Sequence, residues 1–129
     1  MNVETKYASP LKLKNLMITE GSVKRKEDSL EDIELGIQVN RDIENISENE
    51  YKITLELTVS DANEQITVYV KGVALFETKQ ENMVLIEKNT IAIMFPYLRS
   101  YISMLTTQPG MMPIVLPAMN IVAMLQDQS

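Results

Sequence analysis

Strict alternation of apolar and polar residues from position 51 to 60 constrains the fold of this chain most. Tyr51, Ile53, Leu55, Leu57 and Val59 occupy every second position, with polar residues between them. Successive side chains of a β-strand point to opposite faces, whereas one face of a helix repeats every 3.6 residues. The stretch therefore predicts a strand with one face on the core and one face in water.

Three further stretches extend this pattern. Alternation recurs over residues 33–39 and 66–70, and the sequence DANE at 61–64 predicts a turn. Residues 12–24 form a less regular stretch whose apolar residues change phase, as a β-bulge would cause. Because the connections are short and polar, the four strands predict an antiparallel meander with one wet face.

The chain changes character after the fourth strand. Residues 78–88 are expected to form a connector that carries an apolar group at 83–86. Asn89 or Thr90 is the expected cap of a long helix that runs to about residue 107.

The apolar stripe on this long helix is wider than a sheet requires. It spans about 200° at 100° per residue, whereas packing on one sheet needs little more than about 100°. Pro96 lies inside the helix and is expected to kink or break it. We expect the excess apolar surface to meet a second copy of the chain. The expected interface comprises Ile93, Tyr97, Leu98, Tyr101, Ile102, Met104 and Leu105.

A loop rich in Met and Pro leads to a short apolar segment at residues 119–125. Seven residues do not form a stable helix alone, so this segment is expected to be docked on the rest of the molecule. The complete prediction is an α+β fold: a four-stranded antiparallel meander with a long helix and a short C-terminal helix packed on one face. Residues 1–129 are expected to form one domain, with flexible ends at 1–10 and 126–129.

The composition excludes several classes of function. The chain has no His and no Cys, which removes thiolate nucleophiles, imidazole bases and ordinary zinc sites. We therefore expect no enzyme, no cofactor and no metal, with carboxylate-based catalysis as a remote alternative. A net charge of −6 disfavours nucleic acid as a partner. The lack of a signal-peptide-like start or a long apolar run predicts a cytoplasmic protein that does not insert into membranes.

Methionine is concentrated in the second half of the chain. Seven of the nine Met residues lie between positions 83 and 124. Met is flexible and polarizable, and it is over-used on surfaces that accept varied apolar partners, although it also fills gaps in cores. Packing in a core or an interface is the favoured interpretation for Met94 and Met104. For Met111, Met112 and Met119, contact with a partner is an equal alternative.

Two stretches near the C-terminus resemble the SecB family of protein-export chaperones. They are IMFPYLRSYISML at 93–105 and VLPAMNIVAML at 115–125, and the order of four strands and a connector before them also matches. The matching residues are Phe95, Pro96, Tyr97, Arg99, Leu116, Pro117, Asn120, Ala123 and Leu125.

The resemblance implies a homotetramer, built as a dimer of dimers, that holds unfolded polypeptides or preproteins without ATP. It also implies delivery of these clients to the translocation motor SecA. Clients would lie in an apolar groove formed by the connector, the loop and the last helix. Carried over to this sequence, the groove comprises Met83, Val84, Leu85, Ile86, Met111, Met112, Ile114, Leu116, Met119, Val122 and Leu125.

The charged residues of the exposed sheet face leave two functions open for a SecB-like protein. The family docks the motor on acids of the exposed sheet face, and Glu20 matches such a position. Lys24 has the opposite charge, and Tyr69 stands where another acid is expected. The alternative is therefore a dedicated SecB-like protein for one partner, such as an antitoxin-type chaperone or a phage component, without motor delivery. The acids in 27–34 and 42–50 are either a solvated edge or a docking face for a basic partner.

Overall fold

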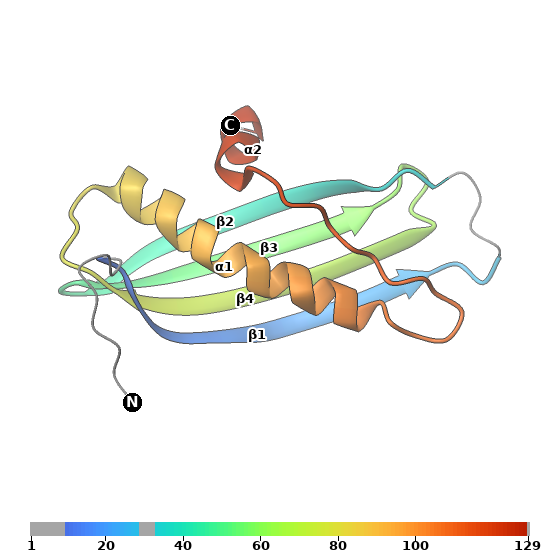
Figure 1. Ribbon diagram of the computed structural model, residues 1–129, viewed down its shortest axis with the longest axis horizontal. Helices are drawn as coiled ribbons and strands as arrows, with labels where there is room; N and C mark the ends of the chain where they lie inside the picture. Colours follow the sequence, from blue (N-terminus) through green and yellow to red (C-terminus); the bar gives the residue numbers. More distant parts are fainter. Residues whose placement is uncertain (1–9, 29–32, 129) are drawn as a thin grey trace.

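The structure is a computed structural model that describes residues 10–28 and 33–128 (Figure 1). It contains four antiparallel strands and two helices that lie on the same face of the sheet. These elements are β1 (Lys12–Arg25), β2 (Gly36–Ser47), β3 (Glu50–Ser60), β4 (Ile66–Glu77), α1 (Met83–Leu105) and α2 (Ile121–Gln128). The predicted α+β fold, with its antiparallel sheet, long helix and short C-terminal helix, is confirmed.

The strand order is β1-β4-β3-β2, so one connection differs from a four-stranded meander. Strands β2, β3 and β4 follow one another as predicted, but β1 pairs with β4 rather than with β2. The connection after β1 therefore leads to the opposite edge of the sheet (Figure 1). Its ten residues, 26–35, reach up to about 33 Å when extended, and the edges lie only about 14 Å apart at the usual strand spacing.

The irregularity of β1 was predicted correctly, whereas the bounds of β2 were not. The register of β1 shifts between Leu13 and Asn15 and again between Ile18 and Glu20, which confirms the predicted irregularity of this strand. Strand β2 begins at position 36 and continues to 47, whereas alternation predicted 33–39. Because β2 is an edge strand, most of its side chains beyond position 39 are exposed, and the alternation in the sequence stops before the strand does.

The face of the sheet under the helices forms the core. Alternate residues of β3 and β4, among them Ile53, Leu55, Val68 and Val70, are fully buried there. Helix α1 packs across β1, β3 and β4, and α2 contacts α1. The close approach of α1 depends on Gly72 in β4, because a Cβ atom at this position would lie 2.8 Å from Leu98 Cδ1.

Helix α1 begins two turns earlier than expected. The side-chain oxygen of Asn82 accepts the Val84 and Leu85 amides at 3.0 and 3.3 Å, so Asn82 is the cap and not Asn89 or Thr90. Ile86, at the end of the first turn, is fully buried. This packing explains why the expected connector is helical from Met83 onward.

The remaining predictions about the helices were partly wrong. Helix α1 continues through Pro96 without the expected break, and Pro96 is exposed, where the lost backbone donor costs least. Helix α2 begins after Asn120, whose side chain accepts the Ala123 amide at 3.0 Å, and it extends to Gln128. Residues 126–128 of the expected flexible tail are therefore helical, and residues 1–9 and 129 lie outside the described part of the chain.

Candidate functional site

Two groups of exposed large apolar side chains lie in the segments expected to form a groove. The first, which we call the helix-start patch, consists of Met83, Val84 and Leu85 in the first turn of α1. The second lies in the loop between α1 and α2, where Met112 is 86% exposed and Val115 is 76% exposed. Isolated exposed apolar residues are common, but several together indicate a surface that meets a partner.

The loop between α1 and α2 is held to the end of α1 by the backbone of Ile114. Its amide donates to Thr106 Oγ1 at 2.8 Å, and its carbonyl accepts from Ser103 Oγ at 2.9 Å. Two residues later Leu116 is buried in the core. The loop is therefore anchored to the fold, and its exposed side chains are not simply those of a detached segment.

Arg25 at the end of β1 joins this loop to the chain that follows β1. Its guanidinium donates to the carbonyl of Gly110 at 2.5 Å and to the carbonyls of Lys26 and Asp28 at 3.2 and 3.3 Å. Beside this contact lies an open hollow of about 430 Å³. Its apolar wall, which we call the loop patch, comprises Ile33, Leu35, Ile66, Met111, Met112 and Ile114.

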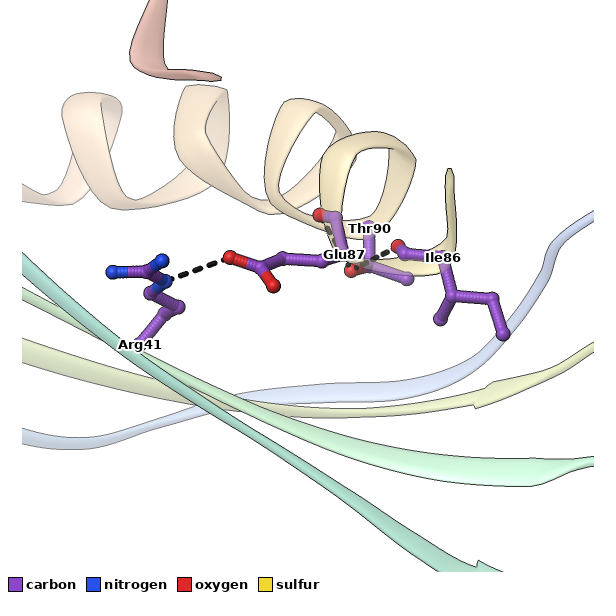
Figure 2. A network of polar contacts seen from close by, with 4 residues as sticks. All are labelled: Arg41, Ile86, Glu87 and Thr90. Atoms are coloured by element: carbon purple, nitrogen blue, oxygen red, sulfur yellow. Dashed lines mark hydrogen bonds and ion pairs between the residues drawn. The ribbon is translucent and has the colours of Figure 1, made fainter. Parts of the chain in front are cut away.

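A second, smaller hollow of about 120 Å³ lies between β2, α1 and α2. Val84, Ile91 and Leu125 supply its apolar part. Arg41 reaches from β2 toward Glu87 on α1, with Nε and Oε1 2.7 Å apart (Figure 2). Because both side chains are about one-third exposed, the pair contributes only about 0–1 kcal/mol. The hollow therefore combines apolar walls with a charged rim.

The structure divides the eleven residues expected in the groove. Met83, Val84, Leu85 and Met112 are exposed, and Met111, Ile114 and Met119 are half-buried. Ile86, Leu116 and Leu125 are buried in the core of the chain, and Leu125 also lines the smaller hollow. The side chain of Val122 lies outside the described part.

Sequence reasoning missed two members of this surface. Val115 was left out although Pro113 and Pro117 flank it, a spacing that favours extended, solvated backbone. Leu35 was assigned to a strand, but it precedes β2 and is 39% exposed in the loop patch. Both residues carry the signal of an apolar side chain outside a regular element.

The apolar stripe of α1 is divided in the same way. Leu98 and Ile102, which we expected in an interface, are fully buried against the sheet. Tyr97 and Met104 are 54% and 63% exposed. Ile93, Tyr101 and Leu105 are half-buried. We call Ile93, Tyr97, Tyr101, Met104 and Leu105 the outer helix face. Its contact with a second copy stays a prediction.

The opposite face of the sheet carries the position expected to dock a motor. Glu20 is exposed there, and its partner in the strand register is Lys71, a residue of opposite charge. The Tyr69 hydroxyl donates a hydrogen bond to the Glu56 carboxylate. This bond, with burial and the charges of Glu56 and Glu20, raises the pKa of Tyr69 from 10.0 to about 12. Within the described residues, no cluster of acidic side chains is suited to hold a metal ion.

Titration of the protein is expected to show that the Tyr69 phenol ionises near pH 12. The folded state favours the neutral phenol, so the stability contributed by Tyr69 is present below about pH 10 and is lost as the pH rises toward 12. Ultraviolet absorbance of phenolate would detect this step. Tyr69→Phe should remove it, and Glu56→Gln should lower the pKa. Tyr97→Phe, the control, should leave the step unchanged; its disappearance there would contradict the assignment.

The fold, an antiparallel sheet with a long helix and a short C-terminal helix, is the α+β fold of SecB-like proteins. A SecB-like chaperone from Mycobacterium tuberculosis, solved with a peptide from the HigA1 antitoxin, has a TM-score of 0.69 and 10% sequence identity, with 84% of this chain and 87% of that chain covered. A protein of unknown function from Streptococcus agalactiae has a TM-score of 0.50 and 10% identity, with 84% and 97% covered. A comparison with curated protein sequences finds no match.

The sequence itself matches the family described as preprotein translocase subunit SecB over residues 2–129. The chain therefore belongs to the SecB family. Membership of this non-enzymatic family supports a chaperone role. In residues 10–28 and 33–128, no helix has the length and apolar character needed to cross a membrane.

Proposed function

We propose that this protein is an ATP-independent holdase that binds apolar segments of non-native polypeptides. The exposed apolar side chains of the anchored loop carry this proposal, above all Met112 and Val115. An unfolded client offers the same kind of side chain in extended form. Contact between the two removes apolar surface of both from water.

The arrangement of the patches favours an extended client over a small ligand. Helix α1 has 23 residues, so about 34 Å separates the helix-start patch at its beginning from the loop that follows its end. Burying one large apolar side chain yields about 1.5–3 kcal/mol, and micromolar binding needs about 8 kcal/mol after association costs of about 4–15 kcal/mol. Several anchors along one chain satisfy this requirement, whereas one open hollow does not.

The outer helix face is proposed to join copies of the chain into a homotetramer, a dimer of dimers. Its exposed members, Tyr97 and Met104, lie two turns apart on α1. Between residues 89 and 105 the only charged residue is Arg99, so a second apolar surface can approach with little desolvation of charge. Assembly would also place the client surfaces of several copies in one particle.

Light scattering of an aggregating protein tests the holdase proposal. We expect citrate synthase, heated alone, to aggregate, and we expect one tetramer per client chain to suppress the scattering. Val84→Ser combined with Met112→Ser should weaken suppression, because each lost apolar contact costs up to about 1.5–3 kcal/mol. Both side chains are mostly exposed, so folding should change by less than about 0.5 kcal/mol each.

Met17→Ser is the matched control. Met17 is 49% exposed, but it lies on β1 opposite Val73, on the face away from the helices. The substitution removes the same kind of side chain without touching either patch. Suppression by this variant should equal that of the unaltered protein. The proposal fails if the unaltered protein does not reduce scattering at a stoichiometric ratio.

A dedicated chaperone for a single partner is the second candidate function. The structural similarity to a SecB-like chaperone bound to an antitoxin peptide favours it. So does the sheet face, where Lys24 and Tyr69 stand at positions at which acids are expected to dock a motor. Binding to a panel of unrelated unfolded proteins separates the two: similar affinities favour the general holdase, and one tight partner favours the dedicated chaperone.

Delivery of clients to SecA would place Glu20 at the docking surface. Its neighbour in register, Lys71, opposes attraction of a basic partner. If delivery occurs, Glu20→Lys should abolish binding to SecA and leave client binding intact. Binding of SecA that is insensitive to this change would remove Glu20 from the docking surface.

A further inference from the structure

The sulfur chemistry of this chain is confined to methionine. The sequence has nine Met and no Cys. Thiolates are usually the first side chains that peroxides oxidise, and they are absent from this protein. A two-electron oxidant that reaches the protein therefore meets thioethers as its only sulfur targets.

The thioethers of the described residues differ in exposure, and Met104 and Met83 are 63% and 44% exposed. Met112, on the wall of the hollow beside Arg25, is the most exposed large apolar residue of the described chain at 86%. Met111, in the same wall, is half-buried. Met94 is fully buried in the core. Met17 is 49% exposed on the far face of the sheet. Oxidation should thus begin at the loop patch and spare the core.

We propose that Met112 is an oxidation site whose sulfoxide weakens client binding, so that hydrogen peroxide or hypochlorous acid regulates this surface. With peroxide, a lone pair of the Met112 sulfur attacks one oxygen, an S–O bond forms and the O–O bond breaks. The sulfur loses two electrons, and the second oxygen leaves as water after taking up a proton from the first. The regulation rests on the proposed holdase function.

Oxidation is expected to weaken client binding because it turns the apolar side chain of Met112 into a polar one. The sulfoxide oxygen is a strong hydrogen-bond acceptor, and an apolar client side chain offers it no donor. Binding must then either expose the sulfoxide to water or bury it unpaired. We expect affinity for an unfolded client to fall about tenfold, which corresponds to about 1.4 kcal/mol. Methionine sulfoxide reductases should reverse the loss.

The test uses the full-length protein and a fluorophore-labelled, reduced and carboxymethylated lactalbumin, which cannot refold. The chaperone is treated with limiting hydrogen peroxide, freed of oxidant and analysed by peptide mass mapping. We expect oxygen at Met112 first and none at Met94. Fluorescence anisotropy should show the tenfold loss, and incubation with reductases of both sulfoxide epimers should restore binding.

Three variants make the result specific. Met112→Leu has no thioether at this position, so its client affinity, whatever its value before treatment, should be the same after treatment. Met112→Gln, which carries a permanent polar group, should bind as weakly as the oxidised protein without treatment, with an unchanged circular dichroism spectrum. Met17→Leu should respond to peroxide as the unaltered protein does, because Met17 lies on the far face.

The outcomes separate this inference from the proposed function. If the untreated protein does not bind unfolded lactalbumin, the holdase proposal fails and the regulation fails with it. If the untreated protein binds and the protein oxidised at Met112 binds equally well, only the regulation is overturned. Equal loss of affinity in treated Met112→Leu would also overturn it, since another residue would then be responsible.

Discussion

Gly72→Val is expected to lower the melting temperature by about 10 °C. A Cβ atom at position 72 would lie 2.8 Å from Leu98 Cδ1, 3.5 Å from Leu98 Cγ and 3.6 Å from Ile18 Cδ1. Leu98 is fully buried between α1 and the sheet, so it has little room to move. Overpacking of this kind costs about 1–3 kcal/mol, and each kcal/mol shifts the melting temperature of a chain of this size by roughly 3–5 °C. Thermal unfolding followed by circular dichroism measures the effect.

Gly36→Val is the matched control for this prediction. Position 36 also lies in a strand, but a Cβ atom there would meet only the Ser60 carbonyl oxygen at 3.9 Å, an ordinary contact. Valine favours strands more than glycine does, so stability should change little or rise. In Gly72→Val, a second change of Leu98→Ala should cost less than it does alone, because it removes the clash. Equal losses for the two glycine variants would show that α1 does not approach the sheet through Gly72.

The sheet was readable from the sequence because its signal is local. In β3, Ile53, Leu55 and Leu57 alternate with polar residues, and all three are fully buried. An antiparallel strand inside the sheet has one face on the core and one face in water, and this imposes the alternation on its sequence. The pattern fades in β2, an edge strand, and there the predicted bounds were wrong.

The start of α1 and the pairing of β1 could not be predicted from local sequence patterns. Asn82 and Asn89 are chemically identical caps, and the choice between them is made by burial of Ile86, a tertiary contact. The pairing of β1 with β4 likewise joins segments far apart in the sequence, such as Val23 and Val68. Local propensity carries no information on either choice.

The same reasoning applies to the candidate site. Of the residues that the sequence assigned to the groove, Met83, Val84 and Met112 are exposed, and their contact with clients stays a prediction. The sequence did not separate them from Ile86 and Leu125, which are equally apolar but buried. Exposure depends on the angle at which each element docks on the sheet, and this angle is set by the packing of the whole core.

Replacing Tyr97 and Met104 together by Asp is expected to dissociate the proposed assembly. These are the two most exposed apolar side chains of the outer helix face. In an interface with two-fold symmetry each substitution occurs twice, so four apolar side chains are lost, at about 1.5–3 kcal/mol each. Burial of the new carboxylates adds a further penalty. The sum, about 6–12 kcal/mol, weakens association by at least four orders of magnitude.

Native mass spectrometry and sedimentation velocity measure this effect directly. The unaltered protein should run as a tetramer, and the double variant as a dimer or a monomer with an unchanged circular dichroism spectrum. Met17→Asp places the same charge on the far face of the sheet and should leave the assembly intact. Because Leu98 and Ile102 already fix α1 to the sheet, the double variant should fold normally. A double variant that remains tetrameric would show that the copies meet elsewhere, and the outer helix face would then be free for clients.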